Sequence, residues 1–205
     1  SRLKRENESL KGRAGADSEL HGSSVAMRQL RQLLKKIAPA NSRVLISGDM
    51  GTGKELTARM LHALSTRAEG PFVTLSAATM APERMEEELF GVEAAPGIEQ
   101  RVGALEEAHG GTLFIDEVAD MPLVTQGKVL RVLLDQTFQR VGGAKKVRVD
   151  VRIVSSTSRD LVSLIAENKF REDLYHRLGV VLVRVPSLSE RREDIPELID
   201  YFAKT

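Results

Sequence analysis

The stretch Gly48-Asp49-Met50-Gly51-Thr52-Gly53-Lys54-Glu55 follows a short apolar run, Val44-Leu45-Ile46-Ser47. The helical pattern after it places four apolar residues on one face, Leu56, Met60, Leu61 and Leu64. A glycine loop between a strand and a helix is the context of a phosphate-binding P-loop. Glycine lets the backbone N–H groups turn inward, and the helix start adds the positive end of its dipole. Lys54 supplies a mobile charge for the β- and γ-phosphates of a nucleotide, which favours this interpretation over a turn that binds nothing.

Glu55 departs from the general P-loop pattern. The residue after the lysine is ordinarily Ser or Thr, whose hydroxyl binds Mg²⁺. A carboxylate in the first helical turn suits the helix dipole, but it does not replace a hydroxyl ligand. We therefore expect magnesium to depend on other groups and on water.

Two acids end a third apolar run, Thr112-Leu113-Phe114-Ile115-Asp116-Glu117. At the carboxyl end of a buried strand opposite a P-loop, Asp116 can hold Mg²⁺ directly or through water. Glu117 can orient and polarise an attacking water. The alternative is a helix N-terminus that simply favours acidic residues. The P-loop upstream favours the catalytic interpretation.

Composition excludes few classes of protein. A length of 205 residues suggests one main domain, and 30 basic against 29 acidic residues leave a net charge of +1, so neither nucleic acid nor membrane is demanded as a partner. The absence of cysteine excludes disulfides and thiolate metal sites and fits a reducing cytoplasm, where we expect the protein. No signal peptide or membrane-spanning run is recognised.

Periodicity predicts an α/β fold. Apolar runs predict a buried strand at 72–75 and further strands at 151–155 and 180–185. A hairpin is predicted at 138–149, with its turn at Gly142-Gly143. Helical patterns cover 23–37, 82–90, 104–108, 122–134, 160–167, 171–178 and 194–202, and 91–103 is expected to be irregular. Strands alternating with helices predict a parallel sheet covered on both faces, with the ligand at the strands' carboxyl ends.

Further motifs stand in order along the chain: Glu88-Leu89-Phe90-Gly91, Gly110 to Glu117, Phe170-Arg171-Glu172-Asp173-Leu174-Tyr175-His176-Arg177-Leu178, and Glu190-Arg191-Arg192-Glu193-Asp194-Ile195. With the P-loop, they resemble the AAA+ central domain of bacterial enhancer-binding proteins of the NtrC type, over roughly residues 17–205. In that family Glu is usual after the P-loop lysine, so the resemblance accounts for Glu55.

The resemblance implies roles for individual residues. ATP or ADP, with Mg²⁺ on Asp116, would lie on all eight residues of 48–55, and Glu117 would be catalytic. Arg171 and Arg177 match arginine fingers that reach a neighbouring subunit's nucleotide, although surface pairing with Glu172 and Asp173 is the alternative. Nucleotide-contacting positions are also implied at His21 and Gly22, which match the adenine pocket, and at Thr157 and Ser158, which match the sensor position. A lone His before a helix is more often a solvated loop residue.

The resemblance also implies a longer parent protein. A phosphorylated receiver domain, served by a cognate sensor kinase, would precede residue 1, and a helix-turn-helix domain that binds DNA would follow residue 205. Residues 1–16 would be a linker helix or tail, 17–186 the AAA+ nucleotide-binding part and 187–205 the start of a truncated helical lid. Leu3 and Leu10 permit a short coiled coil, with a solvated tail as the alternative. Self-association as a dimer or ring is expected.

Three departures from the family pattern bear on activity. The family's activators carry a Gly-Ala-Phe-Thr-Gly-Ala loop that grips sigma-54, whereas Gly91 is followed here by Val92-Glu93-Ala94-Ala95-Pro96-Gly97-Ile98-Glu99-Gln100-Arg101-Val102. We therefore predict that this chain does not remodel sigma-54 polymerase. Ser76 stands where the family often has an Asn that restrains the catalytic Glu, and Ser158 replaces a more usual Asn or His.

Three hypotheses follow from this sequence. The first is a transcription regulator in which ATP sets the oligomeric state. The second is a mechanochemical ATPase that acts on a protein partner through residues 91–103. The third is a dimerisation platform with a vestigial P-loop. The sequence leaves open whether ATP is hydrolysed.

Overall fold

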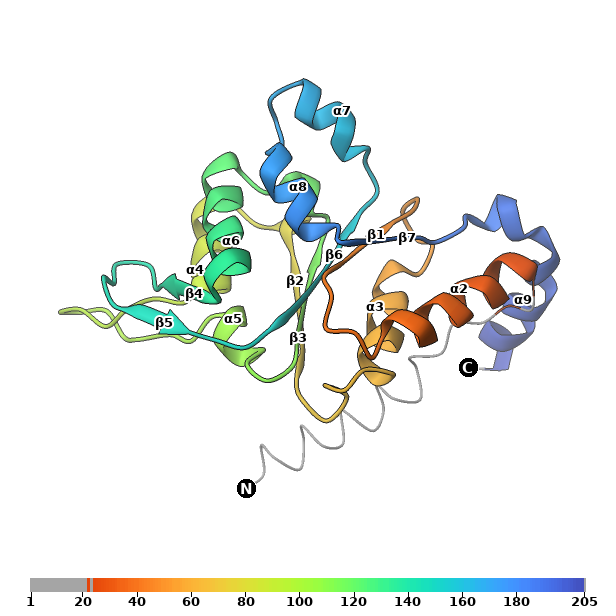
Figure 1. The fold of residues 1–205 in the computed structure, drawn as a ribbon, viewed down its shortest axis with the longest axis horizontal. Helices are drawn as coiled ribbons and strands as arrows, with labels where there is room; N and C mark the ends of the chain where they lie inside the picture. Colours follow the sequence, from red (N-terminus) through yellow and green to blue (C-terminus); the bar gives the residue numbers. More distant parts are fainter. Residues whose placement is uncertain (1–21, 23, 205) are drawn as a thin grey trace.

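The computed structural model describes residues 22 and 24–204. Its centre is a sheet of five parallel strands in the order β2-β3-β6-β1-β7 (Figure 1). The strands are β1 (Val44–Ser47), β2 (Phe72–Ser76), β3 (Thr112–Asp116), β6 (Arg152–Thr157) and β7 (Val181–Arg184). Because all five run the same way, their carboxyl ends meet at one edge of the sheet. The predicted parallel α/β fold is confirmed.

Helices α2 (Val25–Ile37) and α3 (Lys54–Ala63) cover one face of the sheet. Ser24 caps α2, since its Oγ accepts a hydrogen bond from the Met27 amide at 3.2 Å. The predicted apolar face of α3 is largely confirmed, since Leu61 is fully buried and Leu56 and Met60 pack against the same core. Leu64 differs, because it is 38% exposed and lies past the end of the helix.

The opposite face packs on a second cluster of apolar side chains. Its helices are α4 (Pro82–Phe90), α5 (Ala104–Glu107), α6 (Leu123–Asp135), α7 (Leu161–Ala166) and α8 (Glu172–Leu178). Short 3₁₀ turns η1 (Ala77–Thr79) and η2 (Val118–Asp120) follow β2 and β3. Since side chains of the sheet enter both clusters, the prediction of helices on both faces is confirmed.

One prediction about strands needs correction. The strand at 72–75 is β2, an edge strand in which Leu75 is the buried residue and Thr74 is exposed, so it is not a buried strand. Residues 91–103 form no helix or strand, as predicted, but isolated bridges join Val92 to Arg101 and Ala95 to Ile98 around a turn. We call 91–103 the arm.

The arm lies beside the predicted hairpin, which is present as β4 (Thr137–Gln139) and β5 (Lys146–Arg148) (Figure 1). Val92 forms a parallel bridge with Val141 at the hairpin turn, and the Val141 amide donates to the Gly91 carbonyl at 2.9 Å. The two extended segments therefore project from the body together.

After β7 the chain forms the 3₁₀ segment η3 (Leu188–Asp194) and the helix α9 (Ile195–Lys204). The predicted linker at 1–16 lies outside the described residues. Among the described helices, none has the length and apolar character needed to cross a membrane.

Candidate nucleotide-binding site

The P-loop connects β1 to α3 at the carboxyl edge of the sheet. Gly51 and Gly53 have φ of +76° and +96°, a region that side-chain-bearing residues rarely adopt. A Cβ on Gly48 would lie 2.9 Å from the Val185 carbonyl oxygen. The Gly48 amide donates to the Thr157 carbonyl at 3.3 Å, which holds the loop against the end of β6.

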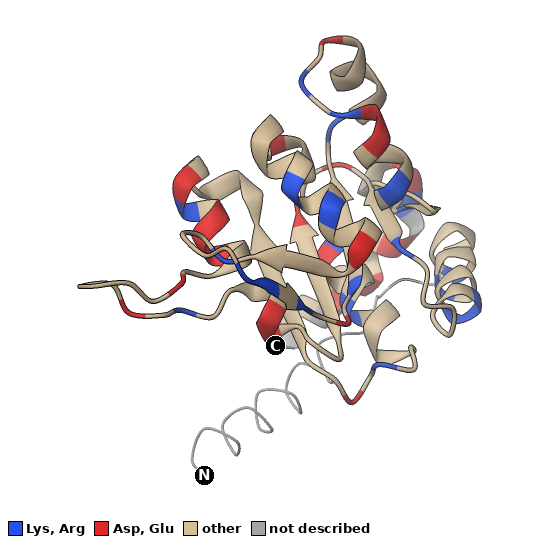
Figure 2. Ribbon diagram, turned by 60° about the vertical axis from the view of Figure 1, so that its left-hand side comes forward, with Lys and Arg blue, Asp and Glu red and all other residues tan. Residues whose placement is uncertain are grey.

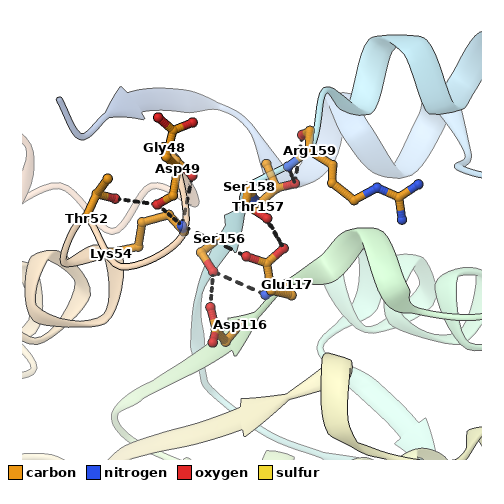
Figure 3. A network of polar contacts seen from close by, with 10 residues as sticks. All are labelled: Gly48, Asp49, Thr52, Lys54, Asp116, Glu117, Ser156, Thr157, Ser158 and Arg159. Atoms are coloured by element: carbon orange, nitrogen blue, oxygen red, sulfur yellow. Dashed lines mark hydrogen bonds and ion pairs between the residues drawn. The ribbon is translucent and has the colours of Figure 1, made fainter. Parts of the chain in front are cut away.

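Lys54 lies in the first turn of α3, buried beneath the loop. Its Nζ donates to the carbonyl oxygens of Gly48 and Asp49, each at 2.8 Å, and lies 3.9 Å from Glu117 Oε1 (Figure 3). Amides in the first turn of a helix have no partner within that helix. Glycine backbone, helix start and lysine together fit a chain of phosphates.

Asp116 and Glu117 end β3 opposite the loop, and Ser156 of β6 connects them. The Ser156 hydroxyl donates to Asp116 Oδ1 at 2.5 Å and accepts from the Glu117 amide at 3.2 Å (Figure 3). A carboxylate fixed in this way suits Mg²⁺, which binds one or two carboxylates together with water and phosphate oxygens. Ser156 was not predicted as a site residue, although a run of small hydroxyl residues ends this buried strand.

Glu117 has a backbone conformation in the left-handed region, with φ 55° and ψ 59°. Such conformations cost free energy in residues other than glycine and often mark functional sites. Its Oε2 accepts from both the amide and the hydroxyl of Ser158, at 3.1 and 3.0 Å. Ser158 therefore holds the carboxylate that the family resemblance makes catalytic.

Among the described contacts of Glu117, none is to Ser76. Thr157 is buried, and its hydroxyl donates to the Arg159 carbonyl and accepts from the Arg159 amide. That hydroxyl therefore stabilises the turn after β6, and a nucleotide contact for Thr157 stays a prediction.

Glu55 is exposed, and its Oε1 accepts a hydrogen bond from the guanidinium of Arg59, one turn further along α3, at 3.3 Å. Met50 at the loop tip is exposed, and Thr52 donates from its hydroxyl to the Asp49 carbonyl at 2.8 Å. Asp116 is therefore the side chain of this site that could hold a metal ion, and that role stays a prediction.

Neither candidate arginine finger contacts the chain's own P-loop in the described part of the structure. Arg171 is exposed and forms two hydrogen bonds to Asp173, at 3.0 and 2.9 Å, and these bonds lower the pKa of Asp173. The predicted alternative, pairing with Asp173, is therefore the arrangement seen in the single chain. Arg177 is also exposed, and its charge adds to burial in lowering the pKa of Arg43.

Gly22 is buried with φ 129°, and a Cβ there would lie 2.6 Å from the carboxylate of Asp194. Gly22 therefore lies directly against Asp194 of η3. His21 lies outside the described residues. His62 is buried and has a ring nitrogen 2.8 Å from the Thr112 hydroxyl.

The sequence matches the family described as the Sigma-54 interaction domain over residues 20–184. It is 60% identical over 201 residues to the nitrogen assimilation regulatory protein NtrX of Azorhizobium caulinodans, covering 98% of this chain and 44% of that protein. It is 47% identical over 191 residues to the DNA-binding transcriptional regulator NtrC of Escherichia coli K12, covering 92% of this chain and 41% of that protein.

The structure resembles that of NtrX from Brucella abortus in complex with ATP, with a TM-score of 0.88 and 61% identity, covering 99% of this chain and 46% of the other. The stretches 103–109, 116–122 and 155–161 had indicated a likeness to NtrX in particular, and the comparisons confirm it. The chain spans less than half the length of these relatives. As its P-loop, acid pair and Phe170–Leu178 motif predicted, the chain belongs to the Sigma-54 interaction domain family, the AAA+ domain of NtrC-type regulators.

Proposed function

We propose that this chain is the ATP-binding AAA+ domain of a two-component response regulator that controls transcription in an NtrY/NtrX type of signalling system. The observation that carries the proposal is the approach of Lys54 to Glu117 beneath the glycine loop. Structures of NtrX from Brucella abortus are complexes with ATP and with ADP, which supports a nucleotide at this loop. A cognate sensor kinase and DNA would be partners of other parts of the regulator.

Each side chain then has a defined task. Bound Mg-ATP would supply the phosphate oxygens and a metal that neutralises their charge. Lys54 would exchange the Gly48 and Asp49 carbonyls for phosphate oxygens, and Asp116 would hold the metal. Glu117, oriented by Ser158, would accept a hydrogen bond from the attacking water. Arg171 and Arg177 would act on the nucleotide of a neighbouring copy.

Thermal unfolding with and without Mg-ATP tests nucleotide binding. A ligand that binds the native state at 100 times its Kd stabilises it by about 2.7 kcal/mol, so Tm should rise. Lys54→Ala should abolish this rise, whereas Lys35→Ala, an exposed lysine on α2, should keep it. The absence of a rise in the unmodified chain would favour the dimerisation platform with a vestigial P-loop.

We also propose that the chain does not remodel sigma-54 polymerase, because the arm carries no aromatic residue at its tip. The tip turns through Pro96-Gly97 between Ala95 and Ile98. Co-purification with sigma-54 in the presence of a transition-state nucleotide analogue would contradict this proposal.

A second candidate is an active ATPase that moves a protein partner through the arm. The observation in its favour is the ordered pairing of the arm with the β4–β5 hairpin. Phosphate release from Mg-ATP should then rise cooperatively with protein concentration. Arg171→Ala should abolish that rise, and Arg84→Ala, another exposed arginine, should not. Bound ATP without turnover would leave the nucleotide as a structural switch.

A further inference from the structure

A second concave site lies away from the P-loop, between α6 and the β4–β5 hairpin. Its volume is about 320 Å³, at the lower end of the range found for ligand sites. The lining residues used below are Phe90, Lys128, Arg131, Phe138, Arg140 and Lys146. We call it the hairpin pocket. No residue of the nucleotide site lines it, so it is a separate feature of the domain.

The hairpin pocket is basic, with four cationic side chains and no acidic one in its lining. Figure 2, which brings this side forward, shows Lys and Arg along the hairpin. Two of the cations are already paired: Lys128 with Glu86, at 2.6 Å, and Arg140 with Glu106 and Glu93. Arg131 and Lys146 are exposed and form no ion pair within the described part of the chain. Two charges are therefore available to an anionic ligand.

The aromatic floor of the pocket argues against nucleic acid. Phe90 and Phe138 are 2% and 5% exposed, and their rings pack on each other with centroids 5.9 Å apart. Binding of single-stranded nucleic acid relies on aromatic faces that are open for bases to stack on. These faces are covered, so bases have no surface to stack on. The guanidinium of Arg131 can pair with a carboxylate of a peptide through two N–H groups.

The surface continues beyond the pocket onto the arm. Val141 lines the pocket, and its carbonyl accepts from the Glu93 amide at 3.0 Å. On the arm, Ile98 and Val102 are 53% and 52% exposed. A small anion would use the pocket alone, but a chain segment can reach both the charges and these apolar side chains.

We propose that the hairpin pocket is the docking site for an acidic peptide segment of a protein partner. Arg131 and Lys146 bind its carboxylates, and an apolar side chain of the same segment lies against Val141 and the arm. Arg140 is a positioning residue, because its bonds to Glu106 and Glu93 join the hairpin to α5 and to the arm. The proposal goes beyond nucleotide binding and does not depend on it.

Fluorescence anisotropy of the labelled peptide EEEFEEE with the 205-residue chain tests the proposal. Arg131→Glu combined with Lys146→Glu removes both available charges. Arg28→Glu combined with Lys35→Glu, on exposed positions of α2, changes the net charge equally and is the matched control. Loss of two charge-assisted contacts should weaken binding at least about tenfold in the pocket variant, and the control should stay within about twofold.

Citrate and the peptide KKKFKKK complete the test. Citrate at matched carboxylate concentration should fail to displace EEEFEEE, and KKKFKKK should not bind. Displacement by citrate would assign the pocket to small free anions instead. Equal weakening in both double variants, or no binding of EEEFEEE to the unmodified chain, would overturn the proposal.

Discussion

Two neighbouring serines on β6 are equally buried but differ in their partners. Ser156 Oγ joins Asp116 Oδ1 to the Glu117 amide. Ser155 Oγ makes no hydrogen bond within the described residues. Burying a hydroxyl without a partner costs free energy, whereas removing a hydroxyl that satisfies two other groups leaves those groups unpaired.

Ser156→Ala should therefore lower the free energy of unfolding by about 1–3 kcal/mol. Ser155→Ala removes an unpaired hydroxyl and should be neutral or stabilise by up to about 1 kcal/mol. Urea denaturation of both variants measures the difference. Equal destabilisation by the two substitutions would show that packing, and not hydrogen bonding, sets the energetics here.

The backbone of Glu117 allows a second prediction at this scale. A non-glycine residue in the left-handed region costs roughly 1–2 kcal/mol, part of which glycine gives back through its greater freedom in the unfolded chain. Glu117→Gly should therefore be more stable than Glu117→Ala by about 1 kcal/mol. Both variants lose the carboxylate, so comparing their denaturation midpoints isolates the backbone. A more stable alanine variant would contradict the inference that the backbone of Glu117 is strained.

Residue types and spacing predicted much of the candidate site. Lys54, Asp116 and Glu117 converge because a P-loop and an acidic strand end occupy the same edge of a parallel sheet. The role of Ser158 in holding Glu117 was not predicted, because it depends on the rotamer of Glu117 and on the turn after β6. A contact between residues that follow two strands distant in the sequence cannot be predicted from the local sequence pattern.

At the scale of elements, the positions of the strands in the sequence were easier to predict than the order in which the strands pair. Local hydrophobic runs located the strands, but the order β2-β3-β6-β1-β7 and the edge position of β2 depend on long-range packing. The arm was expected to be irregular, although Pro96-Gly97 between Ala95 and Ile98 is compatible with a tight turn. Its pairing with the β4–β5 hairpin could not be inferred from either segment alone.

Arg140 is the element-scale connection that can be tested. It donates to Glu106 through two nitrogens, at 2.8 and 3.0 Å, and to Glu93 at 3.2 Å, and these bonds raise its pKa. Arg140→Ala should release the arm, so that hydrogen exchange at the Val92 and Glu93 amides accelerates about tenfold or more. Arg101→Ala removes one exposed pair with Glu87 and should change exchange little.

At the scale of the whole molecule, Asp194 joins the two ends of the described chain. It is fully buried, although it carries a carboxylate. Its oxygens accept from the Ser24 amide at 2.7 Å and the Ser24 hydroxyl at 2.5 Å, 170 residues away in sequence. Arg191 lies 3.9 Å from the same carboxylate. The start of α2 is thereby attached to the segment that leads into α9.

Asp194→Ala should lower the free energy of unfolding by about 3 kcal/mol, because it leaves the Ser24 amide without its acceptor and removes the carboxylate that faces Arg191. For a domain of this size the corresponding fall in Tm is roughly 6–12 °C. Glu197→Gln, at an exposed position on α9, is the control and should change stability by no more than about 0.5 kcal/mol.

Calorimetry of Asp194→Ala also distinguishes a local from a global loss of stability. If α9 alone detached, the main transition would keep its Tm and limited proteolysis would cut near 187–205, whereas a shift of the main transition means that Asp194 stabilises the sheet domain through α2. We expect the shift, since α2 packs its buried face on the core that contains β1 and β7.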